Sequence, residues 1–319
     1  MKKLQFFDNM YIYIKKELYY NVINNEEDGK MNKYKGIFTA LLTPFDNENK
    51  VNEKELEKLV KFCLDKGVKG FYVGGSTAEA FLLSTDERKQ IMDVVKSTAG
   101  DATLIAHIGS INELEATELA KHAKNIGYDV ISSVAPFYYK FTFDEIKNYY
   151  FRLADSAGLP MLVYHFPAFS GVNMGASEMS KFLSDERFLG IKYTSNDFFT
   201  LEQCKTNFPD KLVYNGFDEM LLSGLVMGAD GGIGSTYNFM ADKFVKIYNL
   251  FNEGKIEEAQ AVQKEANRII TILCKIGVMQ AEKEVLNQLG FDFGICRHPF
   301  GEPTAEDKAL IAKEIIPYL

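Results

Sequence analysis

The amino-acid sequence predicts an α/β fold, a closed (β/α)₈ TIM barrel followed by a C-terminal helical extension, and three observations carry this prediction. From Lys35 onward, short apolar runs alternate with amphipathic stretches of about 12–17 residues. Several of the short runs, among them FYVGG, TLIAHIG and PMLVYHFP, are continuously apolar, which is typical of parallel strands buried on both faces. An open doubly wound sheet would have a glycine-rich turn after its first strand, and the segment LLTPFDNEN at that place contains no glycine.

Eight strand–helix units over about 220 residues fit a closed barrel. The predicted strands cover residues 36–44, 70–75, 103–109, 130–136, 160–167, 188–194, 212–217 and 231–236. The stretches between them, such as NEKELEKLVKFCLDKG and STDERKQIMDVVKS, carry their charges on one helical face. Ser84 and Glu87 have the spacing of a capping box, and Gly67 and Gly127 stand where helices are expected to end.

The pattern divides the chain into three regions. Residues 33–253 form the predicted barrel, and residues 254–319 a C-terminal helical region with helices over 255–290 and 304–317. Residues 1–30 are rich in tyrosine, asparagine and charge, and Asp8 and Lys15 interrupt the apolar run of about 7–15 residues that a signal peptide needs. We interpret them as a disordered extension or as sequence upstream of the true start at Met31. The alternative is a helix over about residues 9–24 that docks on a partner.

Composition excludes several functional classes. The chain has 36 basic and 44 acidic residues, a net charge of −8, so it offers no basic surface for a nucleic acid. No apolar run reaches the roughly 20 residues that span a bilayer. Four widely spaced cysteines predict neither a disulfide framework nor a zinc site and favour a cytoplasmic protein. The four histidines show no metal-binding spacing, so we expect no metal, and we expect His107 to be a hydrogen-bonded core residue.

Lys192 is the most informative residue of the predicted barrel, because it lies in the short apolar strand FLGIKYTS. Burial disfavours the ammonium form, and a neutral amine can form a Schiff base with a ketone. Tyr164 on the preceding strand is a candidate proton carrier. The alternatives are a lysine whose amine reaches solvent or pairs with an acid, and a tyrosine that fills the core.

Further polar residues collect at the carboxyl ends of the strands, where barrel enzymes hold their active sites. Ser76 and Thr77 follow two glycines and could offer hydroxyl and N–H groups to a carboxylate. Asp218 and Glu219 could bind sugar hydroxyls or a metal, and by themselves they most resemble a cap of the following helix. The run GADGGIGST could cradle a phosphate, although it contains no lysine or arginine.

Six segments together resemble one family. YVGGSTAEAF, PFYYKF, LVYHFPAFSGV, GIKYTS, YNGFDE and GADGGIGSTYN are similar, in order and spacing, to motifs of the dihydrodipicolinate synthase/N-acetylneuraminate lyase family of pyruvate-dependent class I aldolases. The resemblance covers about residues 33–319. It implies a catalytic Schiff base on Lys192, no other cofactor, a small-molecule substrate and a homotetramer.

The resemblance also implies roles for individual residues. Tyr164 would relay protons, Ser76 and Thr77 would hold the substrate carboxylate, and Tyr138 would reach across a subunit contact to join a hydroxyl relay with Ser76 and Tyr164. The sugar end would be lined by Thr194, Gly216, Asp218, Glu219 and Ser235. On this basis we expect Asp218 and Glu219 to bind sugar hydroxyls, with capping as a second role.

The resemblance favours the branch that cleaves sialic acid (N-acetylneuraminate) to pyruvate and N-acetylmannosamine. Dihydrodipicolinate synthases carry an arginine after the strand-five tyrosine to bind a second carboxylate, and Phe169 stands there in this chain. The chain departs from the family at Ala78, usually glycine, whose methyl would disturb the Ser76–Thr77 turn if that position needs a positive φ. It also departs at His165, often asparagine, which we expect to face the barrel wall.

Three alternatives remain open from the sequence. One is another aldolase of the same family, acting on aspartate semialdehyde or on a 2-keto-3-deoxy sugar acid. The second is a phosphosugar isomerase or synthase barrel with a phosphate site near residues 231–236. The third is a catalytically silent sugar-acid sensor.

Overall fold

The computed structural model describes residues 31–319, of which residues 36–319 form a single compact unit. The predicted extension over residues 1–30, with its alternative helix, lies outside the described residues. The barrel and the C-terminal helices belong to the same unit, so the C-terminal region is not a separately packed domain.

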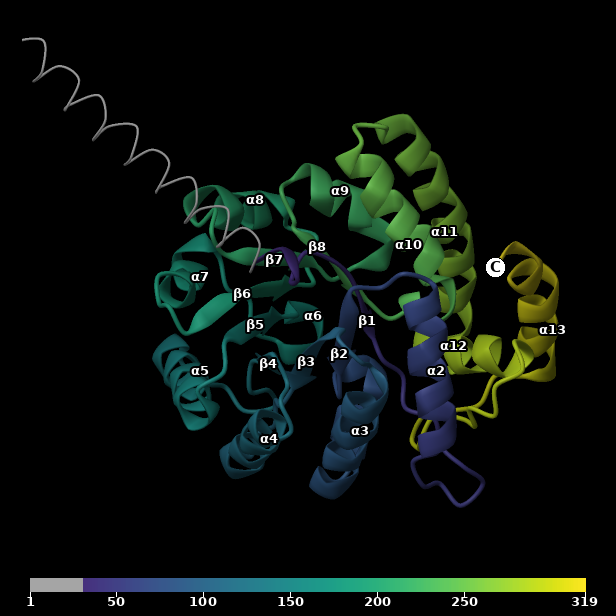
Figure 1. The fold of residues 1–319 in the computed structure, drawn as a ribbon, viewed down its shortest axis with the longest axis horizontal. Coiled ribbons are helices and arrows are strands. Elements are labelled where there is room, and N and C mark those ends of the chain that lie inside the picture. The colour runs from purple at the N-terminus through teal and green to yellow at the C-terminus, as the bar shows by residue number, and fades with distance from the viewer. Residues whose placement is uncertain (1–30) are drawn as a thin grey trace, which may run out of the picture. The chain divides into compact units, whose positions relative to one another are not determined.

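Eight parallel strands close into a barrel in the order β1 to β8, with β1 paired to β8 (Figure 1). The strands are β1 (Gly36–Ala40), β2 (Gly70–Val73), β3 (Thr103–His107), β4 (Val130–Val134), β5 (Met161–His165), β6 (Phe188–Tyr193), β7 (Leu212–Asn215) and β8 (Gly231–Gly234). The predicted TIM barrel is therefore confirmed. Each strand ends one to four residues before the predicted end, because the last residues of each predicted strand leave the ladder and turn into the loops at the mouth of the barrel.

Helices surround the strands, as Figure 1 shows for α3, α4, α5, α7 and α8. They are α2 (Glu53–Asp65), α3 (Thr85–Thr98), α4 (Glu113–Asn125), α5 (Phe143–Ala157), α6 (Pro167–Ser170), α7 (Ala176–Leu183), α8 (Phe198–Asn207), α9 (Leu221–Val226) and α10 (Tyr237–Asn252). The capping box at the start of α3 is confirmed, because Ser84 Oγ accepts from the Glu87 amide and Glu87 accepts from the Ser84 amide. Gly67 and Gly127 follow α2 and α4 with positive φ, as expected for helix ends.

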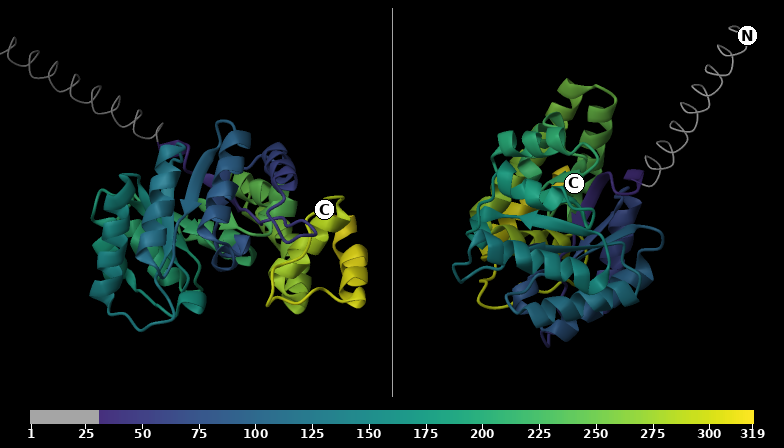
Figure 2. Two further views of the ribbon diagram at one scale, coloured as in Figure 1. Left: turned by 90° about the horizontal axis from the view of Figure 1, so that it is seen from below. Right: turned by 90° about the vertical axis from the view of Figure 1, so that its left-hand side faces the viewer.

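After α10 the chain is helical only, as predicted, and its helices lie to one side of the barrel (Figure 2). They are α11 (Ile256–Ile276), α12 (Val278–Gln288) and α13 (Ala305–Glu314). The stretch predicted as helical over residues 255–290 is two helices that meet at Gly277, whose φ of +120° breaks the helical backbone. Helix α11 packs on α10, and α12 packs on α11.

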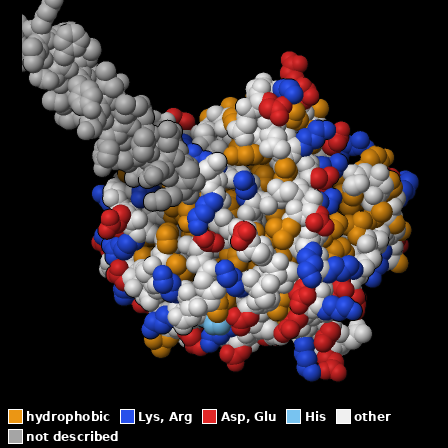
Figure 3. Space-filling view, in the orientation of Figure 1, with side chains coloured by type: hydrophobic (Ala, Val, Ile, Leu, Met, Phe, Trp, Pro, Cys, Tyr) orange, Lys and Arg blue, Asp and Glu red, His pale blue; other side chains and the backbone are white. Residues whose placement is uncertain are grey.

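Charges of both signs are interspersed on the face drawn in Figure 3, and no broad basic area gathers there. Such a surface does not offer a row of phosphate contacts on that face. Among residues 31–319, no helix has the length and apolar character required to cross a bilayer.

Candidate active site

Lys192 lies on β6 inside the barrel, beside Tyr164 on β5 and Tyr214 on β7 in the strand register. It is 4% exposed, and its Nζ lies 4.1 Å from the ring centroid of Tyr164 and 4.2 Å from that of Tyr72. Within residues 31–319 no carboxylate forms an ion pair with Lys192. Burial lowers the pKa of Lys192 to about 7, while the charge of Asp218 acts in the opposite direction. A substantial fraction of this amine is therefore neutral near pH 7.

Tyr164 is buried directly beside this amine. Burial raises the pKa of its phenol to about 12, and the nearby hydroxyls of Ser76 and Thr194 oppose that rise. The phenol therefore keeps its proton at neutral pH. It can take a proton from a substrate only as it gives its own proton to a neighbouring group. Tyr72 packs edge-on against Tyr164 and donates a hydrogen bond to Ser132 Oγ at 3.0 Å, which fixes both rings around the lysine.

A cavity of about 630 Å³ opens above Lys192 at the carboxyl ends of the strands. All but one of the site residues predicted from the sequence line this cavity. These are Lys192, Tyr164, Ser76, Thr77, Thr194, Gly216, Asp218, Glu219 and Ser235. The exception is Tyr138, which is 84% exposed, has a positive φ of 76° and does not line this cavity. Within one chain the structure does not bring Tyr138 to Ser76 and Tyr164.

The turn that carries Ser76 and Thr77 is a short 3₁₀ helix, η1 (Ser76–Ala78). Ala78 is buried in it, and the Ala78 carbonyl accepts a hydrogen bond from Thr43 Oγ1 at 2.9 Å. The residue with the left-handed backbone is Glu79, at φ 60°. The backbone at position 78 therefore does not require glycine, and the alanine found there leaves the turn intact.

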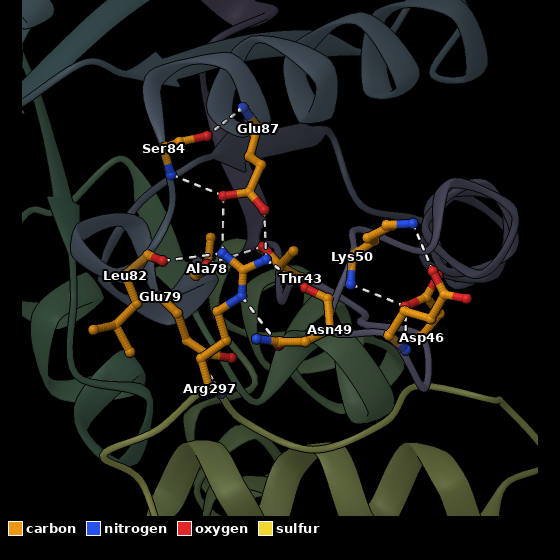
Figure 4. Close-up of polar contacts among 11 residues, drawn as sticks. Thr43, Asp46, Asn49, Lys50, Ala78, Glu79, Leu82, Ser84, Glu87 and Arg297 are labelled. Atoms are coloured by element: carbon orange, nitrogen blue, oxygen red, sulfur yellow. Dashed lines mark hydrogen bonds and ion pairs between the residues drawn. The ribbon is translucent and has the colours of Figure 1, made fainter.

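Glu79 fastens this turn to the C-terminal region. Its buried carboxylate forms an ion pair with Lys283 of α12, at 2.6 Å, and accepts a hydrogen bond from the Arg297 amide at 2.7 Å. Figure 4 shows the Arg297 guanidinium reaching past Glu79 to Glu87, the Leu82 carbonyl and Asn49. The hydrogen bonds from Arg297 lower the pKa of Glu87 to about 2.

Asp218 is the buried acid of the site. It accepts hydrogen bonds from the Thr236 amide at 2.8 Å and from Thr236 Oγ1 at 2.7 Å, and burial raises its pKa to about 6. Gly234 is required beside it, since a Cβ there would overlap the Asp218 carboxylate. Asp218 thus binds the start of α10. Asp218 and Glu219 also form the first turn of the short 3₁₀ helix η3 (Asp218–Met220) that follows β7, as expected, but the N-cap residue is Phe217 and no side chain caps this helix.

The same contacts bear on the phosphate alternative. The Thr236 amide, which a phosphate near β8 would need, already binds the Asp218 carboxylate. An anion at this point would face that acid, so residues 231–236 do not form a phosphate cradle. No group of three or more His, Cys, Asp or Glu within residues 31–319 is arranged to hold a metal ion.

The two histidines that lie on strands, His107 and His165, have structural roles. His107 Nδ1 lies 2.9 Å from the Gly74 carbonyl, its Nε2 accepts from the Val134 amide at 3.3 Å, and burial lowers its pKa well below the usual value. It is the neutral, hydrogen-bonded core histidine that was predicted. His165 points away from Lys192 and stacks on Tyr193 with the ring centroids 5.1 Å apart, so it faces the barrel wall as expected.

Several residues of the site were missed from the sequence. Tyr72 contacts Lys192. Side chains alternate between the two faces of a strand, so the place of Tyr72 between Phe71 and Val73 on β2 could have indicated that it points into the barrel. Met279 and Gln280 of α12 line the cavity, which no local motif marks. Glu282 is fully buried behind Ser235. Its place on the same helical face as the apolar residues Val285 and Leu286 could have indicated this burial.

Residues 33–316 match the dihydrodipicolinate synthetase family. The chain belongs to this family. It is 43% identical over 283 residues to the N-acetylneuraminate lyase of Clostridium perfringens, covering 88% of this chain and 98% of the relative. Among solved structures, CdNal from Clostridium difficile in complex with mannosamine superposes with a TM-score of 0.87 at 42% identity, over 89% of this chain and 99% of that one.

A second member of the family was solved with a small ligand. The N-acetylneuraminate lyase of Fusobacterium nucleatum, complexed with pyruvate, superposes with a TM-score of 0.84 at 39% identity, over 89% of this chain and 98% of that one. The expected family membership is therefore confirmed, and the named relatives belong to its lyase branch.

Proposed function

We propose that this protein is an N-acetylneuraminate lyase, a class I aldolase that cleaves sialic acid reversibly to pyruvate and N-acetylmannosamine. The observation that carries the proposal is Lys192, a buried lysine without an ion-pair partner in the described chain, whose amine faces Tyr164 at the base of the cavity. The relatives that are named N-acetylneuraminate lyases at 42–43% identity support the same substrate.

The proposed reaction begins with the neutral amine of Lys192, which attacks the C2 ketone of the open-chain sugar acid. Loss of water gives an iminium, which accepts electrons from the adjacent C3–C4 bond. The Tyr164 hydroxyl takes the proton of the C4 hydroxyl as it passes its own proton to the Ser76 hydroxyl beside it, and N-acetylmannosamine leaves. The relay returns this proton to C3 of the enamine on Lys192, and hydrolysis of the resulting iminium releases pyruvate and the free amine. The lysine itself supplies the electrophile, so the proposal includes no metal or organic cofactor.

The two ends of the cavity suit the two ends of this substrate. Ser76 and Thr77 offer hydroxyl groups to the carboxylate beside the ketone. At the other end Thr194, Gly216, Asp218, Glu219 and Ser235 present oxygen atoms suited to sugar hydroxyls. Phe169 lines the cavity where a dihydrodipicolinate synthase would have its arginine, and within residues 31–319 Lys192 is the only basic residue of the wall. A second carboxylate would have no guanidinium partner here.

We further propose a homotetramer in which the partner subunit's Tyr138 joins Ser76 and Tyr164. An apolar hollow of about 350 Å³ beside Ser76, lined by Phe81 and Phe137, has room for an aromatic ring, and Tyr138 projects outward from its own chain. The four cysteines are unpaired thiols, which supports a cytoplasmic location.

The test of the proposal is borohydride trapping followed by product analysis. Incubation with pyruvate and sodium borohydride is expected to leave a reduced adduct on Lys192, located by mass spectrometry after digestion. Incubation with N-acetylneuraminate is expected to release pyruvate and N-acetylmannosamine. An adduct without cleavage of N-acetylneuraminate would indicate a sister aldolase, and an unmodified Lys192 in folded protein would indicate the sensor.

A further inference from the structure

Helix α12 buries two successive ionisable residues, Glu282 and Lys283, whose side chains contact different parts of the site. Lys283 turns toward Glu79 and the carboxylate-binding turn. Glu282 turns toward the sugar end of the cavity, where Ser235 Oγ lies 2.7 Å from its Oε1. The side chain of Glu282 does not line the cavity itself, and Ser235 stands between it and the ligand space.

The carboxyl of Glu282 is poorly suited to carry a charge. It is fully buried, and its second oxygen, Oε2, has no hydrogen-bond partner within residues 31–319. Burial raises its pKa to about 8, the nearby Asp218 carboxylate raises it further, and the Ser235 hydroxyl opposes the rise. The Ser235 hydroxyl is the one hydrogen-bond partner of this carboxyl within residues 31–319.

The hydrogen bond to Glu282 decides what Ser235 can offer to a ligand. Ser235 Oγ donates to Glu282 Oε1 across the 2.7 Å contact. A hydroxyl has one hydrogen and two lone pairs, so Glu282 holds the hydrogen of Ser235 and leaves the lone pairs of Oγ to act as acceptors on the cavity side.

Ser235 is otherwise held firmly in place. Its carbonyl accepts hydrogen bonds from the Asn238 amide at 3.1 Å and from Asn238 Nδ2 at 2.6 Å. The next residue, Thr236, is bound by Asp218. The backbone is thus fixed from one side, and the direction of the Ser235 hydroxyl is the remaining freedom at this point of the wall.

We propose that Glu282 is a positioning residue for the sugar end of the cavity, where its buried carboxyl holds the hydrogen of Ser235 and so orients the Ser235 oxygen to accept a hydrogen bond from a sugar hydroxyl. The inference rests on the proposed lyase function and adds a residue that does not touch the ligand. It assigns to Glu282 an effect on binding of the sugar end and none on the imine at Lys192.

The test compares Glu282→Leu, Glu282→Gln and Glu282→Asp with Ser235→Ala and the double variant Ser235→Ala/Glu282→Leu. For each, the KM and kcat of N-acetylneuraminate cleavage are measured beside the rate of borohydride-trapped pyruvate adduct. Glu282→Leu is expected to raise KM about tenfold, because the directed hydrogen bond is lost, and to leave pyruvate trapping unchanged. Glu282→Gln keeps an oxygen that can accept from Ser235 Oγ and is expected to hold KM to within about twofold of the wild type.

The double variant separates positioning from a structural role. If Glu282 acts through Ser235, Ser235→Ala/Glu282→Leu has the same KM as Ser235→Ala. Additive losses, or an unchanged KM in Glu282→Leu, would overturn the inference. Glu282→Asp, whose shorter side chain keeps the acid and withdraws it from Ser235, is expected to behave as Ser235→Ala does. Glu282→Asp takes the place of Glu282→Leu in the test if the leucine variant does not fold.

Two controls isolate this inference from its premises. Glu284→Leu alters another acid of the same helix, which pairs with Lys308 at 3.8 Å outside the cavity, and it is expected to keep the wild-type KM. The wild type is measured first. If it neither forms the pyruvate adduct nor cleaves N-acetylneuraminate, the proposed function fails, whereas normal wild-type activity with an insensitive Glu282→Leu rejects only the role of Glu282.

Discussion

Two buried lysines occupy different regions of this molecule, and their polar partners differ. Lys283 on α12 lies 2.6 Å from the Glu79 carboxylate and donates to the Ile295 carbonyl at 3.1 Å. Lys192 on β6 is also buried, but its amine lies over the rings of Tyr72 and Tyr164. Burial lowers the pKa of both side chains, and only at Lys283 does a hydrogen-bonded carboxylate oppose the shift directly.

The comparison separates a lysine held in an ion pair from a lysine whose surroundings suit the proposed reaction. A buried ammonium with a close carboxylate keeps its charge, and its nitrogen lone pair is unavailable as a nucleophile. A buried amine without such a partner loses its proton near neutral pH and can attack a carbonyl. Burial alone therefore does not indicate catalysis, and the presence or absence of the paired acid distinguishes the two lysines.

The largest expected effect is that of Lys192→Met on turnover. Without the amine no imine forms, so we expect N-acetylneuraminate cleavage to fall to background and borohydride trapping to vanish. Full activity in this variant would end the Schiff-base proposal. The isosteric side chain also removes a costly buried charge, so thermal unfolding should show a protein at least as stable as the wild type.

The stability of the wild type should also depend on pH in a way that Lys192→Met does not. Below pH 7 the native state carries the full cost of a buried ammonium, because Lys192 is charged in both states. Between pH 7 and the usual lysine pKa of about 10.4, the unfolded chain binds more protons than the native one, so stability rises with pH. Denaturant unfolding at pH 6.5 and 9 should show this rise reduced in the variant.

Next in size is Tyr164→Phe. The ring packing around Lys192 is kept and the proton relay is lost, so kcat should fall by about 10²–10⁴. Pyruvate trapping on Lys192 should continue at nearly the wild-type rate, because imine formation needs the amine first. A variant that fails in both assays would instead show that Tyr164 is needed to set the state of Lys192.

Lys283→Met tests the other side of the comparison. Removing one partner of a buried ion pair leaves Glu79 uncompensated, and we expect a loss of about 3–5 kcal/mol in the free energy of unfolding. The double variant Glu79→Gln/Lys283→Met should recover part of that loss in urea unfolding. If both variants are equally unstable, the damage comes from lost packing and not from the unpaired charge.

The smallest expected effect is the pH dependence of imine formation. A lysine with a pKa of about 7 is roughly nine-tenths neutral at pH 8 and one-tenth neutral at pH 6. The initial rate of pyruvate trapping should therefore fall about tenfold from pH 8 to pH 6. A rate that keeps rising to pH 10 would show that Lys192 titrates as an ordinary lysine.

The sequence predicted the barrel and nine residues of the cavity wall because both follow from local patterns. Continuous apolar runs mark buried parallel strands, and residues at the carboxyl ends of such strands converge at one mouth. Lys192 was visible as a charged residue in an apolar strand. Tyr138 remains a prediction, because its expected role needs a second chain.

The sequence by itself thus determined the fold, the position of the buried lysine for which we propose the Schiff base, and the end of the barrel where chemistry is expected. Only the tertiary structure decided which acid meets which partner: Asp218 binds Thr236, Glu282 meets Ser235, and Glu79 pairs with Lys283. These partners come from separate elements, and the sequence offers nothing that matches them. The charge that each group carries depends on how completely the whole fold removes it from water, which is why Lys192 and Lys283 differ although both are buried lysines.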